Sequence, residues 1–174
     1  QHNIITVSNF TKNEIVNYCG ISQDRIMVSY NGVDSDFNCS NCIRNDQSFD
    51  VLYVATFEDR KDHITLVHAL ASLSNYPVYK DIKVAFVGRD LGCKQYVDSV
   101  INKFGLQDNI HIFESVSRNE LLTLYKSSRI FCTTSLYEGF GMPVIEARCC
   151  GLPVVCSDIE VFREIVDDNC LLFK

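Results

Sequence analysis

Six short apolar runs, separated by segments of helical periodicity, fill the chain from residue 49 to residue 174. The first run, "DVLYVA", is apolar after its opening aspartate, which is typical of a parallel strand buried on both faces. Strands joined in this way by helices predict an α/β fold, a Rossmann-like doubly wound parallel sheet of about six strands. The expected strands are 50–55, 83–88, 109–113, 129–133, 153–157 and 170–174. The expected helices are 62–73, 93–104, 117–126, 143–150 and 160–166.

The first 49 residues follow a different pattern. "NIITVS" (3–8) and "RIMVS" (25–29) are strand-like. Between them, Thr11 and Glu14 match a capping box and predict the start of a helix. The polar stretch 34–48 has no periodicity and predicts a hinge or linker. We therefore expect three parts: residues 1–33 outside the six-stranded sheet, a linker at 34–49, and the Rossmann-like domain at 50–174.

The net charge of −6 argues against nucleic acid as a partner, because cationic contacts to phosphates dominate that kind of binding. No apolar stretch approaches the roughly 18–20 residues of a membrane span, and no signal peptide opens the chain. The chain begins with Gln1 and stops directly after an apolar run. We therefore expect both ends to be cut out of a longer protein.

The nine cysteines are the unusual feature of the composition. Their odd number and the adjacent pair Cys149 and Cys150 predict reduced, buried thiols. Reduced thiols indicate a reducing compartment, and we expect the cytoplasm. Cys39 and Cys42 alone have the spacing of metal ligands, whereas a structural zinc site normally needs four ligands. No metal site is expected.

In an open parallel sheet, ligands bind beyond the carboxyl ends of the strands, at the point where the strand order reverses. With the common order 3-2-1-4-5-6, this point lies between the first and the fourth strand. The loop after the first strand is "TFEDRK" (56–61), and the loop after the fourth is "TSLYEGFG" (134–141). We therefore expect a ligand site between these two loops.

The second loop and the helix after it carry groups that suit a phosphorylated sugar. Gly139 and Gly141 have no side chain to block the backbone N–H groups at the helix start, and a helix start favours phosphate. Pro143 fits the first position of that helix, where a missing N–H does no harm. Glu138 and Glu146 are carboxylates, which accept hydrogen bonds from sugar hydroxyls.

Arg60 and Lys61, in the first loop, supply cationic donors for phosphate. Each group also has a simpler explanation. The two cations could form a solvated surface, Glu146 could complement the helix dipole, and Glu138 could cap the helix. Their meeting in one crevice is harder to explain in this way. The pattern therefore predicts a site for sugar hydroxyls and a diphosphate together.

These residues also resemble a known family. Glu138, seven intervening residues and Glu146, with "GFGMP" between and "EARCCGLPVVCSD" from Glu146 onward, resemble the signature of retaining glycosyltransferases with the GT-B fold. The family is the large nucleotide-sugar-dependent one called glycosyl transferases group 1. "VSNFTKNEIVNYCGI", "VLYVATFEDRKDHITLVHAL" and "IHIFESVSRNELLTLYKSSRIF" are similar to other segments of it. The resemblance implies a C-terminal, donor-binding domain, preceded at 1–33 by the tail of the acceptor-side domain.

The resemblance implies roles for the matching residues. The catalytic candidates are Glu138 at the donor sugar and Lys61, helped by Arg60, at the diphosphate. The donor-binding candidates are Glu146 at the ribose, the backbone of Val116 at the base, and the loop of Gly139, Phe140, Gly141, Met142 and Pro143.

The chain departs from the family at three places. Many members have glycine where this chain has Ala55 and arginine where it has Thr56, which leaves Arg60 as a substitute for that arginine. A glycine that usually precedes the base-binding loop is Glu114 or Ser115 here. This last difference leaves the identity of the base open.

The implied activity is that of a retaining glycosyltransferase, which moves a sugar from a nucleotide-diphosphate sugar to a glycan or lipid-linked acceptor. The resemblance favours bacterial surface polysaccharide or lipopolysaccharide synthesis, an acceptor bound through the missing N-terminal domain, and peripheral association of the whole protein with the inner face of the membrane. The 174 residues alone would transfer nothing. No cofactor or metal is implied, because the triplet Asp34-Ser35-Asp36 lies in the expected linker and is explained as a solvated acidic stretch.

Other functions stay open at this point. A sugar-nucleotide epimerase or a phosphorylase shares the architecture, although epimerases carry a Ser-Gly-Gly-type loop where this chain has Glu-Gly-Phe-Gly, and phosphorylases are far longer. A non-catalytic nucleotide-sugar-binding module would keep the same crevice. A dinucleotide oxidoreductase is disfavoured, because no G-x-G-x-x-G follows the first strand.

Overall fold

The computed structural model describes residues 3–38 and 48–174. Its centre is a six-stranded sheet in which every neighbouring pair of strands is parallel. The strand order is β5-β4-β3-β6-β7-β8, which confirms the predicted order 3-2-1-4-5-6. The strands are β3 Phe49–Val54, β4 Val84–Val87, β5 Ile110–Phe113, β6 Ser128–Thr133, β7 Val154–Ser157 and β8 Leu171–Phe173.

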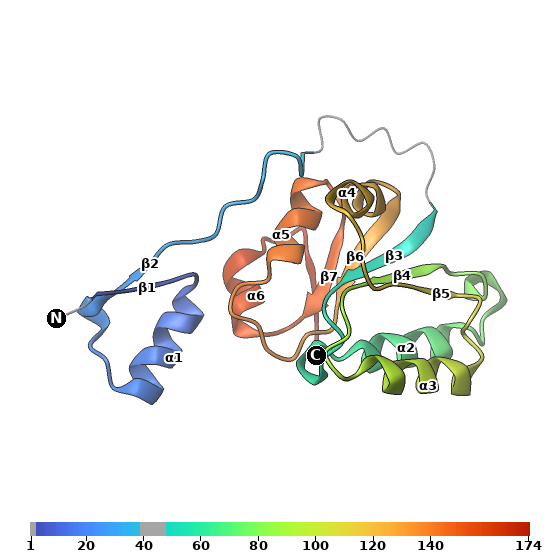
Figure 1. Cartoon of the computed structure of the whole chain (residues 1–174), viewed down its shortest axis with the longest axis horizontal. Coiled ribbons are helices and arrows are strands. Elements are labelled where there is room, and N and C mark those ends of the chain that lie inside the picture. The colour runs from blue at the N-terminus through green and yellow to red at the C-terminus, as the bar shows by residue number, and fades with distance from the viewer. Residues whose placement is uncertain (1–2, 39–47) are drawn as a thin grey trace.

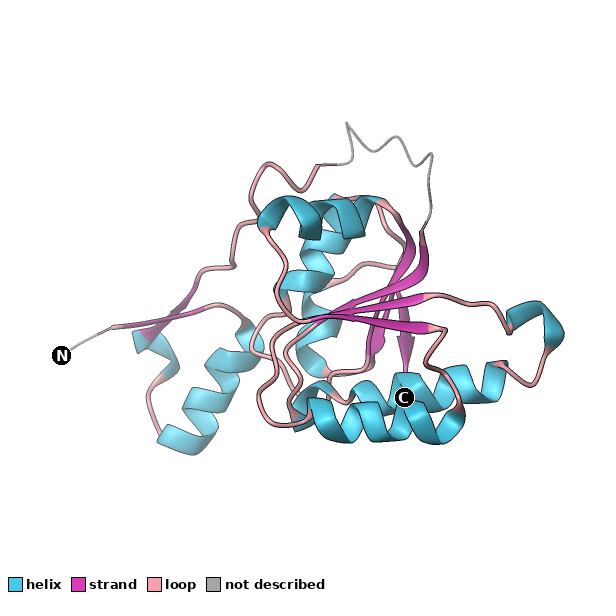
Figure 2. Cartoon of the chain, turned by 45° about the vertical axis from the view of Figure 1, so that its right-hand side comes forward, coloured by secondary structure: helices cyan, strands magenta, loops and turns pink. Residues whose placement is uncertain are grey.

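Helices cover the two faces of the sheet, as Figures 1 and 2 show. Successive residues of β3 point to opposite faces, so that Leu52 packs into one apolar cluster while Val51 and Tyr53 pack into the other. The cluster around Leu52 takes its helical residues from α4, α5 and α6, and the other takes them from α2 and α3. This arrangement confirms the doubly wound fold. The helices are α2 His63–Leu73, α3 Lys94–Phe104, α4 Arg118–Lys126, α5 Met142–Cys149 and α6 Glu160–Ile165.

The N-terminal segment forms a small unit beside the sheet, at the left of Figure 1. Strands β1 (Ile4–Thr6) and β2 (Ile26–Val28) pair with each other in a separate two-stranded sheet, and helix α1 (Asn9–Cys19) packs against α6. The carboxylate of Glu164 in α6 accepts hydrogen bonds from the backbone N–H groups of Asn9, at 2.6 Å, and Phe10, at 3.0 Å. The assignment of 1–33 to another domain stays a prediction.

One predicted helix start is correct and another is wrong. Ser117 and Glu120 form the expected capping box at the start of α4. Helix α1 instead begins at Asn9, and its N-cap is Ser8, whose hydroxyl accepts a hydrogen bond from the N–H of Thr11 at 3.0 Å. Ser8 is extended at the end of the preceding strand segment, and Glu164 binds the next two N–H groups. The helix therefore starts before the pattern at Thr11.

The seven cysteines within the described ranges are free thiols. Burial raises the pKa of Cys132 and of Cys156 to about 12, which keeps both thiols protonated. Cys39 and Cys42, and most of the expected linker at 34–49, lie outside the described residues. No helix in the part of the chain that the structure describes is long and apolar enough to cross a membrane.

Candidate functional site

A cleft of about 530 Å³ lies at the carboxyl ends of β3, β4 and β5. Its lining includes four of the predicted site residues: Arg60, Lys61, Val116 and Pro143. It also includes Ala55, Thr56 and Glu114, three of the positions at which the chain departs from the family pattern. The cleft therefore includes the first of the two predicted loops, through Arg60 and Lys61, but no residue of the second loop (134–141) lines it, and it extends toward β4 and β5.

Gly88, directly after β4, is required by the close approach of two backbones at the base of this cleft. A Cβ atom at this position would lie 1.9 Å from the carbonyl oxygen of Ala55 and 3.0 Å from the N of Thr56. Any other residue would push the loop after β3 away from β4. The glycine therefore fixes the floor of the cleft.

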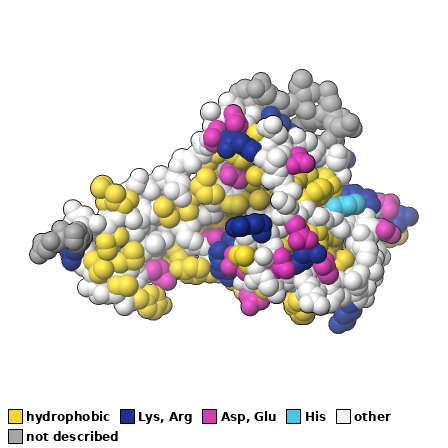
Figure 3. All heavy atoms as spheres, in the orientation of Figure 1, with side chains coloured by type: hydrophobic (Ala, Val, Ile, Leu, Met, Phe, Trp, Pro, Cys, Tyr) yellow, Lys and Arg dark blue, Asp and Glu magenta, His cyan; other side chains and the backbone are white. Residues whose placement is uncertain are grey.

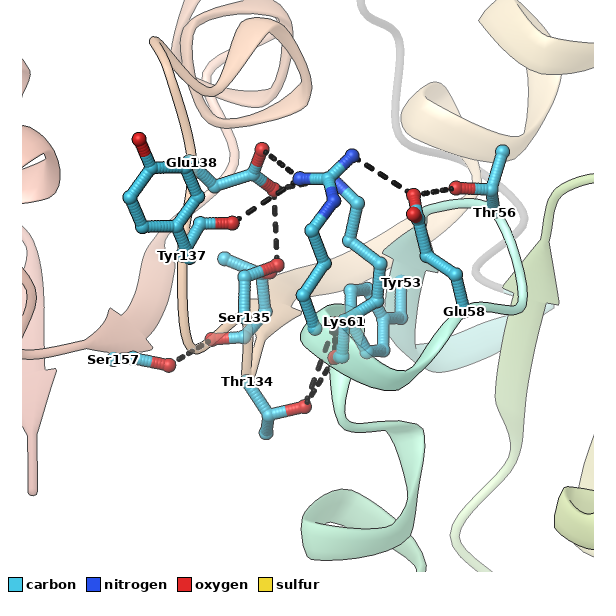
Figure 4. A network of polar contacts seen from close by, with 11 residues as sticks. Tyr53, Thr56, Glu58, Lys61, Thr134, Ser135, Tyr137, Glu138 and Ser157 are labelled. Carbon is cyan, nitrogen blue, oxygen red and sulfur yellow. Dashed lines mark hydrogen bonds and ion pairs between the residues drawn. The ribbon is translucent and has the colours of Figure 1, made fainter. Parts of the chain in front are cut away.

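Lys61 joins the two loops that form the rim of the site, as Figure 4 shows. Its Nζ lies 2.5 Å from Oε1 of Glu138, and both side chains are largely buried, at 11% and 13% exposure. Arg60 binds the other oxygen, with Nη1 3.0 Å from Oε2 of Glu138, and is 42% exposed. The loop after β3 and the loop after β6 are thus held together by one carboxylate between two cations. The explanation of Lys61 as a solvated surface residue is wrong.

The backbone around Lys61 is fixed from below. The hydroxyl of Tyr53 donates to the carbonyl oxygen of Lys61, and the hydroxyl of Thr134 donates to that of Asp62 at 2.6 Å. The hydroxyl of Ser135 donates to Oε1 of Glu138 at 3.0 Å. Figure 4 shows these polar groups around the ion pair. Hydroxyl groups of Tyr53, Thr134 and Ser135 therefore hold Lys61 and Glu138 in place. Sequence reasoning did not single out these three residues.

Glu58 adds a second carboxylate to the cationic side of the rim. Its Oε1 accepts a hydrogen bond from the hydroxyl of Thr56 at 2.6 Å and lies 2.8 Å from Nη2 of Arg60. The hydrogen bond from Thr56, together with Arg60, lowers the pKa of Glu58. Thr56 therefore helps to orient Arg60 through Glu58.

His63, at the start of α2, is buried two residues after Lys61. Its ring stacks between Tyr53 and Phe57, with centroid distances of 4.6 and 4.5 Å. Burial, and then the charge of Lys61, lower its pKa to about 4. The imidazole is therefore neutral near pH 7 and adds no positive charge beside Lys61 and Arg60. The sequence signal that was available for His63 was its position just after the predicted cationic loop (56–61).

Helix α5 begins at Met142 with Gly141 as its N-cap, and no side chain caps it. Glu138 therefore does not cap this helix. Gly141 has a φ of +95°, and a Cβ there would lie 2.6 Å from Cε1 of Phe162, so the position requires glycine. Pro143 is the second residue of the helix, not the first, and it lines the cleft. The uncapped helix start thus lies at the edge of the cleft.

The two glutamates of the motif have different partners. Glu146 accepts a hydrogen bond on Oε2 from the hydroxyl of Tyr125 at 2.8 Å. Burial raises the pKa of Glu146, against the lowering effects of Tyr125 and Arg118. Glu138, by contrast, is engaged by Lys61 and Arg60. In the ligand-free chain the two carboxylates therefore share no partner.

The remaining motif residues make contacts with the N-terminal unit. The carbonyl oxygen of Gly139 accepts hydrogen bonds from the hydroxyls of Ser8, at 2.7 Å, and Thr11, at 3.2 Å. The ring of Phe140 is buried and lies 6.1 Å from that of Tyr30. The Phe140 side chain is therefore turned to the interior, and only its backbone is left for a ligand.

Asp34 and Asp36 face a cation. Asp34 Oδ2 lies 2.6 Å from Nη2 of Arg118, and Asp36 Oδ2 lies 3.1 Å from its Nε. Within 3–38 and 48–174, no group of three or more His, Cys, Asp and Glu side chains is arranged to hold a metal ion. The triplet thus ties the start of the linker to α4.

Comparison with known proteins gives one family. The family model described as "Glycosyl transferases group 1" matches residues 41–174. The O-antigen chain mannosyltransferase B of Escherichia coli is 30% identical over 178 residues, which cover 95% of this chain and 45% of that protein. The chain thus spans about half the length of the curated relatives that it matches.

Solved structures agree with the fold. A glycosyltransferase from Rickettsia africae superimposes with a TM-score of 0.85 at 23% identity, over 99% of this chain and 49% of that one. Anabaena Alr3699/HepE, solved in complex with UDP and glucose, superimposes with a TM-score of 0.80 at 24% identity, over 99% of this chain and 49% of that one.

Proposed function

Since the chain belongs to the glycosyl transferases group 1 family, we propose that it is the donor-binding half of a glycosyltransferase that uses a nucleotide-diphosphate sugar. One observation carries the proposal. Lys61 and Arg60 stand at the rim of the cleft, next to an uncapped helix start, and share a single carboxylate. Two cations beside the positive end of a helix match the charge of a diphosphate.

In this proposal, Lys61 and Arg60 bind the diphosphate of the donor, and the start of α5 approaches it from the other side. When the bond between sugar and phosphate breaks, negative charge grows on the leaving diphosphate. Fixed positive groups stabilise that charge more than they stabilise the donor, which lowers the barrier. These groups supply the positive charge without a metal ion. Departure of the diphosphate and attack by the acceptor on one face of the sugar would retain its configuration.

Glu138 has two tasks in the proposal. In the ligand-free chain it forms ion pairs with Lys61 and Arg60. When the diphosphate takes over these cations, the released carboxylate accepts hydrogen bonds from hydroxyls of the donor sugar. The exchange suits a sugar nucleotide, because the donor brings both the anion that replaces Glu138 and the hydroxyls that satisfy it.

Glu146 and Val116 complete the donor site. Glu146 already accepts a hydroxyl hydrogen bond, from Tyr125, and a ribose hydroxyl would use its second oxygen or replace Tyr125. The backbone of Val116 lines the cleft beyond the end of β5 and would contact the base.

We propose that the whole protein acts in the synthesis of a bacterial surface polysaccharide, as the O-antigen mannosyltransferase to which the chain is similar does by its name. A glycan or lipid-linked acceptor would bind to the part of the protein that this chain does not contain. The free thiols support a reducing compartment. Contact of the whole protein with a membrane surface stays a prediction.

Titration calorimetry with UDP, GDP and ADP tests the proposal, beside the matching nucleosides. At least one diphosphate should bind with one site per chain. Lys61→Met should weaken that binding by about ten- to 100-fold, the effect of one lost charged hydrogen bond. The nucleoside should be affected much less, because Lys61 acts on phosphate.

Lys83→Met is the matched control. Lys83 stands directly before β4, at the amino ends of the strands and away from the cleft, where its Nζ donates to the carbonyl oxygen of Asp108. Its loss removes the same charge and should leave diphosphate binding unchanged. Failure of all three diphosphates to bind, or equal affinities for the wild-type chain and Lys61→Met, would contradict the proposed function.

A further inference from the structure

Two charged side chains line the cleft without a part in the proposed diphosphate site. Arg89 follows β4 and Glu114 follows β5, and the two strands are neighbours in register, with Val87 opposite Phe113. Since adjacent strands lie about 4.8 Å apart, the end of β5 is roughly 10 Å from the end of β3, which leads to Lys61. This distance leaves room for a ribose between a diphosphate at Lys61 and a base at Glu114.

Glu114 is available to a ligand. Its side chain is 53% exposed, and it contacts Nζ of Lys94 at 3.3 Å. Lys94 is at the same time closer to Asp98, at 2.8 Å, so it keeps a carboxylate partner when Glu114 turns away. Within the described part of the chain, the exposed side chain of Arg89 has no hydrogen bond or ion pair. Both groups can therefore turn to a base at little cost.

The chemistry of this pair fits one base. Guanine carries two neighbouring donors, N1–H and N2–H, and a carboxylate offers two oxygens that only accept. On its other edge guanine carries the acceptors O6 and N7, the partners that arginine binds with two hydrogen bonds. Uracil has a single N–H between two carbonyl oxygens, which a carboxylate repels. Adenine turns the lone pair of N1 to the carboxylate.

We propose that Glu114 and Arg89 select guanine, so that the donor is a guanosine-diphosphate sugar. The proposal rests on the proposed function, because it assumes that a nucleoside diphosphate occupies the cleft. It concerns a residue at which the chain departs from the pattern of its family. The UDP of the Anabaena protein does not oppose it, since a likeness at 24% identity shows the fold alone.

Binding of GDP, IDP, UDP and ADP to the 174-residue chain tests the assignment by calorimetry. IDP is GDP without the 2-amino group, so it probes the second hydrogen bond to Glu114 alone. The wild-type chain should bind GDP about ten- to 100-fold more tightly than UDP and ADP, and IDP with intermediate affinity. This comparison needs no variant and so does not depend on how a mutant folds.

Glu114→Gln probes the same contact from the protein side. An amide has one acceptor and one donor, so it cannot accept from both donors of guanine. GDP should then bind no better than IDP, while UDP should change by less than about twofold, within the usual scatter of a surface substitution. Arg89→Met should weaken GDP and IDP equally, because both bases keep O6 and N7. The matched control is Asp108→Asn, which removes the same charge at the other end of β5.

The outcomes separate the two proposals. If UDP or ADP binds the wild-type chain as tightly as GDP, the guanine assignment is wrong and the proposed function stands. If Glu114→Gln, shown to be folded by its melting curve, keeps the full preference of the wild-type chain for GDP over IDP, Glu114 is not the selecting residue. If no nucleoside diphosphate binds at all, the guanine assignment fails together with the proposed function.

Discussion

In the ligand-free chain, Glu138 binds the two cations, Lys61 and Arg60, that we assign to the diphosphate. It is the only described carboxylate that pairs with both Lys61 and Arg60, and two of these three side chains are largely buried. A diphosphate must therefore compete with Glu138 for its cations. This competition gives Glu138 opposite effects on stability and on affinity.

Glu138→Gln should weaken the ligand-free fold and strengthen the binding of a nucleoside diphosphate. Lys61 loses its partner in a nearly buried position, which costs about 1–3 kcal/mol of unfolding free energy. For a chain of this size the melting temperature should fall by roughly 2–4 °C for each kcal/mol. The freed cations should bind the diphosphate about fivefold more tightly, or roughly 1 kcal/mol. Thermal melting and calorimetry measure the two effects.

The same substitution should reduce the preference of the chain for the sugar nucleotide over the bare diphosphate. The wild-type chain should bind the intact donor in preference to the bare diphosphate, because Glu138 then meets sugar hydroxyls. Glu138→Gln should lose most of that preference. Weaker binding of the bare diphosphate by this variant would argue against competition between Glu138 and phosphate.

His63 should make the fold sensitive to mild acid. Its pKa is about 4 in the folded chain, against a reference value of 6.5. As pH falls from 6.5 to 4, the unfolded chain takes up a proton that the folded chain refuses, so acid favours unfolding. The loss should approach roughly 3 kcal/mol at the lower end.

His63→Phe keeps an aromatic ring between Tyr53 and Phe57 and removes the titrating group. Urea unfolding between pH 7.5 and 4 compares the two proteins. The difference in unfolding free energy between them should shift in favour of the variant as pH falls below about 6.5, the reference pKa of histidine. A constant difference across this range would show that His63 does not carry the effect.

At the scale of elements, the two glycines near the start of α5 are there for different reasons. Gly141 needs its positive φ and the space next to Phe162, whereas a Cβ on Gly139 would meet nothing closer than Oγ1 of Thr11, at 3.9 Å. Neither conformation nor packing therefore requires glycine at 139. Open space for a ligand is the remaining reason for it in our account.

Gly141→Ala should destabilise the ligand-free chain by about 1–3 kcal/mol from backbone strain alone, with crowding at Phe162 adding to it. Gly139→Ala should leave the melting temperature nearly unchanged and weaken the binding of the sugar nucleotide. Melting and calorimetry on the pair give a direct comparison. A large loss of stability in Gly139→Ala, with donor affinity intact, would assign that glycine to the fold.

Most elements of the large domain could be predicted from the sequence, because each carries its own local signal. The apolar runs gave the strands, and Ser117 with Glu120 gave the start of α4. The same local pattern failed at Thr11 and Glu14, because Ser8 caps the helix one turn earlier and Glu164, from α6, binds its first N–H groups. A contact between distant segments decided that start.

The residues of the site could be predicted from the sequence better than the contacts between them. The sequence placed Lys61 and Glu138 on facing loops, but it did not predict that they pair, since they are 77 residues apart in the chain. It also left open that Lys61 is a solvated surface residue, whereas Tyr53 and Thr134 hold its backbone in a buried position. The hydrogen bond of Glu146 to Tyr125, 21 residues away in the chain, was likewise not predicted.

At the scale of the whole molecule, the small N-terminal unit exposes apolar side chains, as the yellow groups at the left of Figure 3 show. Ile5 and Met27 lie opposite each other on β1 and β2, and both are exposed. A paired apolar surface of this kind is what the tail of an acceptor-side domain would present to the rest of that domain. The division of the chain at residue 33 stays a prediction.

We expect the 174 residues to bind a nucleotide and to transfer no sugar. The chain spans 45% of the E. coli relative, and the proposed acceptor site lies in the part that it lacks. Transfer assays on the chain and on the full-length protein, with the same sugar nucleotide and acceptor extract, compare the two. Transfer by the chain alone at the rate of the full-length protein would contradict this expectation.

The most direct test of the central claim is a crystal structure of the chain with the nucleoside diphosphate that binds best. The measured quantity is the distance from Nζ of Lys61 to the nearest phosphate oxygen. We predict a hydrogen bond of about 2.7–3.2 Å, with Lys61 released from Glu138 and the base next to Val116. A nucleotide bound elsewhere, with the contact between Lys61 and Glu138 intact, would contradict the account.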